Sequence, residues 1–182
     1  MSDEGDNSDI VAATRHWLEV AVIGLNLCPF AKAVHVKQQI RYAVTQASSE
    51  SELLAVLRDE LSLLAKADAN DIDTTLLIHP QALTDFIDYT AFLRQTDRLL
   101  RRQGHEGTLQ IASFHPAYEF AGSAPDDIEN CSNRSPYPML HLLREDSIER
   151  AVAAFPDAGE IYERNIETLR KLGHIGWRRL FI

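Results

Sequence analysis

Two apolar segments of the sequence end in a histidine that is followed directly by a proline. His79 closes LLIHP, and His115 closes ASFHP. Proline cannot donate a backbone hydrogen bond and disfavours helix in the residue before it, so each strand is expected to stop at its histidine. If the segment between them is a crossover helix, both imidazoles lie at the C-terminal edge of one sheet, where open α/β sheets bind ligands. Alternatively, each imidazole only hydrogen-bonds a turn carbonyl.

An aperiodic, proline-rich stretch over residues 116–138 follows His115 and contains Asn133-Arg134-Ser135. Loops of this length in compact domains are usually functional or disordered, and the large apolar residues in this one argue against disorder. A guanidinium offers paired donors to a carboxylate or phosphate. We therefore predict that Asn133, Arg134 and Ser135, with Tyr137 and His79, bind an anionic substrate.

Histidines and acidic residues near this loop have the types that general acid/base catalysis needs. We predict that His115 and His141 transfer protons and that Asp127, or Asp126, orients an imidazole. Their spacing matches no diagnostic motif. Two structural alternatives stay open: His141 faces the core, and Arg134 pairs with one of the two aspartates to clamp the loop.

The cofactor is unknown, and no metal ligand is assigned. A divalent-metal site made by His79, His115 and His141 is an alternative, although the sequence lacks the paired-histidine spacing of zinc enzymes. Cys28, in LNLCPFAK, is a candidate reactive thiol. Cys-Pro-Phe-Ala is similar to a thioredoxin-like turn, but here a helix is expected before Cys28 and a strand after it, so a buried, inert thiol is the alternative.

Hydrophobic periodicity indicates the elements that position these residues. Apolar residues at helical spacing predict helices over 10–25, 53–64 and 82–103, and two closing helices over 139–155 and 157–172. Alternating or continuous apolar runs predict strands over 34–44, 74–79 and 107–115. The order α-β-α-β-α-β-loop-α-α predicts a layered α/β fold with a small, mostly parallel sheet flanked by helices.

Length and charge restrict the class of protein. The chain has 182 residues and a net charge of −9, with two widely spaced cysteines. We predict a disordered acidic tail over residues 1–9 and a single domain over 10–182. The acidic balance argues against nucleic-acid binding, and the lack of a signal segment or a long apolar run predicts a cytoplasmic protein without membrane contact. The oligomeric state is left open.

Three segments together resemble a family of bacterial and plastid proteins catalogued as a domain of unknown function, number 1415. They are GLNLCPFAK, QIASFHPAYEFAG and SNRSPYPMLHLLRE, and the similarity runs from about Thr14 to Trp177. The resemblance implies a stand-alone single-domain protein and assigns no catalytic residue, cofactor or substrate.

From the residues we expect a small-molecule enzyme, a hydrolase, lyase or transferase, that acts on an anionic substrate in a pocket at the C-terminal strand edge. The alternative is a non-catalytic protein that binds a small anion, or regulates through it, in the same pocket.

Overall fold

A four-stranded mixed sheet forms the centre of the computed structural model, which describes residues 2–155 and 157–182. Its strands are β1 (Ile40–Val44), β2 (Thr74–Ile78), β3 (Leu109–Phe114) and β4 (Met139–Arg144), in the order β1-β2-β4-β3. β1 pairs with β2 in parallel, whereas β4 is antiparallel to both β2 and β3. The predicted α/β class is therefore confirmed, but the prediction of a mostly parallel sheet is wrong.

The error arises at β4, because MLHLLR was expected to begin a closing helix. In a central strand both faces are buried, and Met139, Leu140 and Leu142 are all fully enclosed. Such a continuous apolar run has no period of two, and it cannot be distinguished from a buried helical segment by periodicity. β4 inserts between β2 and β3, so these two strands point the same way without being neighbours.

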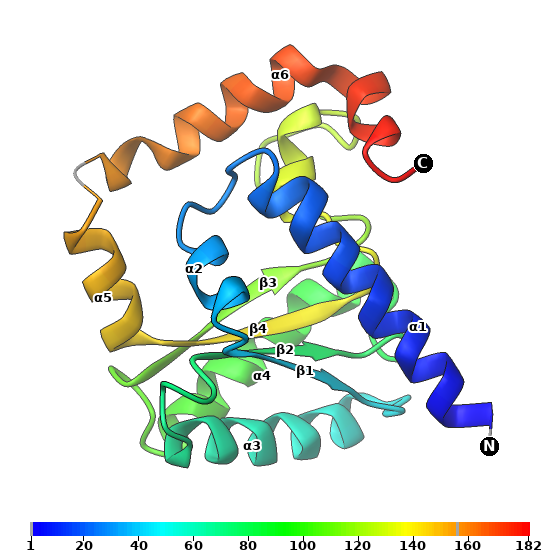
Figure 1. The fold of residues 1–182 in the computed structure, drawn as a ribbon. Coiled ribbons are helices and arrows are strands. Elements are labelled where there is room, and N and C mark those ends of the chain that lie inside the picture. The colour runs from blue at the N-terminus through cyan, green and yellow to red at the C-terminus, as the bar shows by residue number, and fades with distance from the viewer. Residues whose placement is uncertain (1, 156) are drawn as a thin grey trace.

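Two helices cover one face of the sheet (Figure 1). α3 (Glu50–Lys66) begins at the predicted capping box of Ser49 and Glu52, and its leucines form the apolar stripe that meets the sheet. α4 (Phe86–Arg102) begins at Asp85, whose carboxylate accepts hydrogen bonds from two amides of the first turn. These helices match their sequence-based predictions because each carries both an N-cap and a helical apolar stripe.

The opposite face is covered less completely, by α1 (Ser2–Trp17), α2 (Ala31–Val36) and α5 (Glu145–Ala153), as Figure 1 shows. α1 continues into a π-helical segment, η1 (Leu18–Ile23), and begins inside the predicted acidic tail, of which Met1 lies outside the described residues. The strand predicted over 34–44 is wrong in its first half, where α2 ends and Gln38 adopts a left-handed conformation before β1.

After α5, the chain forms a short 3₁₀ segment, η3 (Ala158–Glu160), and a long helix, α6 (Ile161–Arg179). α6 lies across the top of the molecule in Figure 1 and packs on the loop between β3 and β4. In the described part of the chain, no helix has the combined length and hydropathy that a membrane span requires.

The loop between β3 and β4 is held by internal hydrogen bonds and contains a 3₁₀ segment, η2 (Ile128–Asn133). Asn130 is fully buried at its centre. Its Oδ1 accepts hydrogen bonds from the Phe120 amide and the Ser123 hydroxyl, and its Nδ2 donates to Ala124 O. The buried carboxamide thus ties the first half of the loop to the second.

Replacing Arg144 with Met is expected to lower the free energy of unfolding by about 3 kcal/mol, because its guanidinium caps α3. Arg144 Nη2 lies 2.7 Å from both Leu64 O and Ala67 O, and 3.0 Å from Ile72 O. Urea unfolding measures the loss. The matched control is Arg101→Met, which removes a solvent-exposed ion pair with Glu106 and is expected to cost less than about 1 kcal/mol. Equal losses in the two variants would contradict the capping role.

Asn130→Ala is expected to destabilise the loop by about 2–3 kcal/mol, since it removes a buried carboxamide and leaves the Phe120 amide and the Ala124 carbonyl without their partner. Limited proteolysis should then cut within residues 116–138 much faster than in the wild-type protein. Asp126→Ala, an exposed change on the same loop, should leave the cleavage rate unchanged. Resistance of the Asn130 variant to proteolysis would show that other contacts hold the loop.

Candidate functional site

A cavity of about 840 Å³ lies over the less completely covered face of the sheet. The strand register divides this face into three rows of side chains, and the cavity takes most of its floor from two of them. The first row is Ile40, Thr74, Leu143 and Gln110, and the second is Tyr42, Leu76, His141 and Ala112. The third row ends at Phe114, whose ring meets that of Trp17 of α1 at 5.4 Å, edge to face. α1 therefore covers the third row and, through Arg15 over the Tyr42 ring, the β1 end of the second, and it leaves the rest of the first two rows to the cavity.

The walls of the cavity are mostly apolar and come from segments far apart in the sequence. α1 and η1 contribute Trp17, Leu18 and Val22, and the turn before α2 contributes Pro29 and Phe30. On the opposite side, α5 presents an apolar face made of Ile148, Ala151 and, just beyond the helix end, Phe155. The rings of Phe30 and Phe155 meet edge to face at 6.0 Å, which joins the two walls. Apolar walls around a few polar groups are typical of small-molecule sites.

His141 is the imidazole on the cavity floor, and its tautomer follows from its hydrogen bonds. Its Nε2 lies 2.7 Å from Thr74 Oγ1, which also lies 2.7 Å from Leu142 O. A carbonyl oxygen only accepts, so the single hydroxyl proton of Thr74 must point to Leu142 O. His141 therefore donates its Nε2 proton to Thr74, which makes Nδ1 the unprotonated nitrogen. Among the residues that the structure describes, Nδ1 of His141 takes part in no hydrogen bond.

Burial lowers the pKa of His141 from its ordinary 6.5 to about 4. The ring is deep in the molecule, yet part of its surface remains open to the cavity. At neutral pH the imidazole is therefore uncharged and carries a lone pair on Nδ1. This arrangement can accept a hydrogen bond or a proton from a bound molecule.

Polar residues gather where the first row meets the cavity's edge. Ser147 Oγ donates to the Asp73 carboxylate at 2.6 Å and accepts from Arg150 Nη2 at 3.0 Å. Exposed Lys37 also lines this edge, and Gln110 adds an amide on the floor. We call Lys37, Asp73, Ser147 and Arg150 the cavity mouth.

Cys28 lines the same cavity and is half-buried. Burial raises the pKa of its thiol, although backbone amides of Phe30 and Ala31 that hydrogen-bond to the sulfur act in the opposite direction. The expectation that a strand directly follows this segment is wrong, since α2 begins at Ala31. The raised pKa keeps the thiol protonated near neutral pH, and a reactive role for Cys28 stays a prediction.

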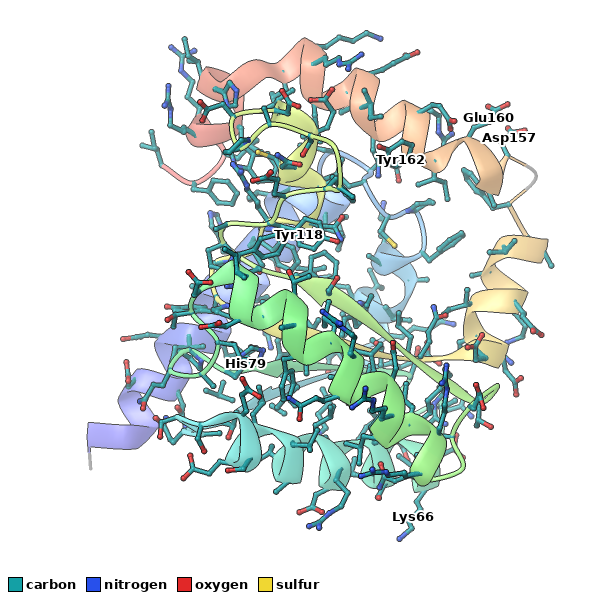
Figure 2. The ribbon with its side chains drawn as sticks, turned by 180° about the vertical axis from the view of Figure 1, so that it is seen from behind. Lys66, His79, Tyr118, Asp157, Glu160 and Tyr162 are labelled. Carbon is teal, nitrogen blue, oxygen red and sulfur yellow. The ribbon has the colours of Figure 1, made fainter. Side chains whose placement is uncertain are left out.

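His79 and His115 lie together on the other face of the sheet, at the predicted C-terminal strand edge. Their rings flank Tyr89, with centroids 6.0 Å and 5.0 Å from the tyrosine ring. Figure 2 shows His79 near the start of α4, with Tyr118 above it. The Tyr89 hydroxyl donates to Met139 O and accepts from the Phe114 amide, so this cluster joins β3, β4 and α4.

Both of these histidines hydrogen-bond the turn that leads into α4. His79 Nδ1 donates to Ala82 O at 2.8 Å, while its Nε2 is buried without a partner among the described residues. His115 Nε2 donates to Leu83 O at 3.1 Å, and its Nδ1 accepts from the Ala117 amide. Burial lowers the pKa of both rings, that of His79 to about 4. These contacts correspond to the alternative in which the imidazoles bind turn carbonyls, and catalysis by His115 stays a prediction.

The side chains of Asn133, Arg134 and Ser135, predicted to bind an anion, instead donate to carbonyl groups of the loop and of β3. Arg134 donates from Nη2 to Pro125 O at 2.6 Å and from Nε to Tyr118 O. Asn133 donates to Ser113 O, and Ser135 donates to Tyr137 O. Arg134 does clamp the loop, but through carbonyl groups in place of the aspartates considered from sequence.

The remaining predicted residues are also separated from one another. The Asp127 carboxylate accepts from the Ala124 amide and orients this turn of the loop. Tyr137 packs at the margin of the core beneath α1. His141 lies on the opposite sheet face from His79 and His115, so the three imidazoles do not meet. Within the described residues, no three His, Cys, Asp or Glu side chains are grouped to hold a metal ion.

Sequence reasoning missed Thr74, Gln110, Lys37 and Arg150, because it expected the site at a strand edge and treated residues 139–155 as a helix. One signal was available. If MLHLLR is treated as a strand, His141 shares a face with Met139 and Leu143, and a lone imidazole on an apolar central strand marks a polar site in the core.

Comparison with known proteins assigns the chain to one family. The family model described as "Protein of unknown function (DUF1415)" matches residues 9–179, which is nearly the whole chain. The chain therefore belongs to this family. No curated protein and no solved structure matches it.

His141→Gln is expected to flatten the dependence of stability on pH. The folded protein holds His141 neutral down to about pH 4, whereas the unfolded chain binds the proton near pH 6.5. The free energy of unfolding therefore falls as pH drops from about 6.5 toward 4. Removing this imidazole should reduce that fall by about 3 kcal/mol.

Urea unfolding of the variant and the wild-type protein at pH 7 and pH 4 measures the difference. His174→Gln, an exposed histidine on α6, is the matched control and should keep the wild-type pH dependence. Parallel pH curves for His141→Gln and wild type would show that the imidazole is not held neutral.

Proposed function

We propose that the protein is a small-molecule enzyme, a hydrolase, lyase or transferase, whose anionic substrate binds in the sheet-face cavity. In this proposal His141 accepts a proton from the substrate through Nδ1. The observation that carries it is the pair of hydrogen bonds that joins His141 Nε2 to Thr74 Oγ1 and Thr74 Oγ1 to Leu142 O. The other ring nitrogen, Nδ1, has no hydrogen-bond partner among the residues that the structure describes.

The hydrogen bonds to Thr74 and Leu142 support this role in the same way that an orienting partner supports a catalytic histidine. They select one tautomer and hold the ring plane, so no rearrangement is needed when the proton moves. When Nδ1 takes a proton, the ring becomes a cation whose Nε2–H bond to Thr74 strengthens. The low pKa means that the proton is passed on readily, which suits a transient acceptor.

The cavity also supports small-molecule chemistry by its size and composition. A volume of about 840 Å³ falls within the usual range for ligand and cofactor sites. Its apolar walls lower the polarity around the imidazole, and this strengthens any hydrogen bond that forms there. The proposed site differs from the strand-edge pocket expected from sequence, because His141 is on the cavity face and the loop donors are engaged by carbonyls.

A second candidate, a non-catalytic binding or regulatory protein, is favoured by one specific observation. Thr74 orients His141 without a carboxylate, so the imidazolium gains only a neutral partner. A ligand that simply donates a hydrogen bond to Nδ1 would be bound and not converted. The two candidates differ in whether the bound molecule changes.

Incubating the protein with a bacterial metabolite extract and following it by mass spectrometry tests the enzyme proposal. We expect at least one anionic compound to be consumed, and consumed about a hundredfold more slowly by His141→Gln, as is typical for loss of a general base. Thr74→Val, which frees the ring to change tautomer, should lower kcat with a smaller change in KM. His174→Gln should retain full activity.

Consumption that is unchanged in His141→Gln would contradict the proposed role. A compound that co-purifies with the protein in a His141-dependent manner, but is never converted, would instead support the binding protein.

A further inference from the structure

The mouth of the cavity is more basic than the protein as a whole. Lys37 and Arg150 both line it, and in the described part of the chain neither takes part in an ion pair. The whole chain carries a net charge of −9, so two unpaired cations at one opening are a local exception. Such a site attracts an anion and repels cationic ligands.

The other charges at the mouth leave this pair available. Asp73 carries the opposing charge, but its carboxylate accepts from Ser147, which separates it from the Arg150 guanidinium. Arg144 also lines the cavity, but its Nε and Nη2 groups donate to the carbonyls of Leu64, Ala67 and Ile72, which directs this guanidinium toward the end of α3. Lys37 and the free N–H groups of Arg150 are therefore the charged donors on exposed side chains at the mouth that a ligand can reach.

The lining of the cavity changes from polar at the mouth to apolar at the far end, and the strand register gives the order of the residues along it. The mouth residues border the first row, His141 lies in the second row, and Trp17 and Phe114 close the far end. One row of a sheet corresponds to about 7 Å along the strand. If a ligand binds with its charged group at the mouth, the part of the ligand opposite His141 lies about 7 Å from that charged group. The remaining atoms of the ligand then lie among aromatic and aliphatic side chains.

From this order we propose that the substrate is an amphipathic carboxylate. Its acid group binds Lys37 and Arg150, its apolar body fills the cavity toward α1, and its reacting group lies roughly 7 Å from the acid, opposite His141 Nδ1. Only one part of this inference rests on the proposed function, namely the position of a reacting group opposite His141. The binding of an apolar body with an anionic head follows from the cavity and its mouth alone.

Equilibrium dialysis with paired probes tests the inference on the full chain. Decanoate and 2-naphthoate carry an acid on an aliphatic or aromatic body, and 1-decanol and 2-naphthol are their neutral counterparts. Both acids should bind more tightly than their counterparts, and the preference should shrink in concentrated salt because exposed charges are screened. The acid that binds more tightly shows whether the cavity prefers an aliphatic or an aromatic body.

Variants locate the binding. Lys37→Gln and Arg150→Gln should each weaken decanoate binding about fivefold and leave 1-decanol binding unchanged, as expected for exposed charges. The matched control is Lys66→Gln, an exposed lysine at the C-terminal end of α3 (Figure 2) that does not line the cavity, and it should change neither. Ala154→Trp fills the cavity from an exposed position and should abolish binding of all four probes.

Three results would overturn the inference: no binding of any probe, equal binding of acids and neutral counterparts, or binding that survives Ala154→Trp. The outcomes remain separate from those of the enzyme test. Decanoate binding that depends on Lys37 and Arg150, together with turnover that ignores His141, would refute the enzyme and leave the ligand class standing. Turnover that depends on His141, together with no binding of decanoate, would support the enzyme and refute the proposed ligand class.

Discussion

The pairing of β4 between β2 and β3 is the interaction on which the rest of the structure depends. Without it, β2 and β3 have no common hydrogen-bonding partner, because neither pairs with the other. Its side chains supply the centre of the core on both faces, with Leu140 and Leu142 toward α3 and α4 and Met139 toward α1. The strand is also what carries His141 to the cavity floor. One six-residue segment thus completes the sheet, both layers and the proposed site.

The two sheet faces are used differently because they are covered differently. α3 and α4 are long, capped helices whose apolar stripes close one face with leucine and aromatic side chains. On the other face, α1 covers the row that ends at Phe114 and the ring of Tyr42, while α2 is short and α5 lies at the margin (Figure 1). None of the side chains of α5 is fully buried although its apolar face is well defined. The cavity is the space that these elements leave over a half-covered sheet.

The histidines show how a similar local pattern can serve different ends. His79 and His115 follow strands that point the same way, and the structure does place them side by side against Tyr89. Their ring nitrogens are used to hold the turn before α4, and burial lowers both pKa values. Within the described part of the chain, Nδ1 of His141 has no partner, because its neighbour Thr74 bonds only to Nε2. The sequence therefore predicted that His79 and His115 lie close together, but it did not predict the hydrogen-bond partner of each ring nitrogen.

The sequence by itself determined the helices α3 and α4, the strands β2 and β3, the α/β class and the family, because caps, helical stripes and apolar runs bounded by proline are local signals. Only the tertiary structure decided that MLHLLR is a strand, that Arg134 and Asp127 hold the loop, and that a cavity lies on the face of the sheet. Strand pairing and the choice of hydrogen-bond partners join residues distant in sequence, such as Thr74 and His141. A local pattern carries no information about which distant partner a segment will meet.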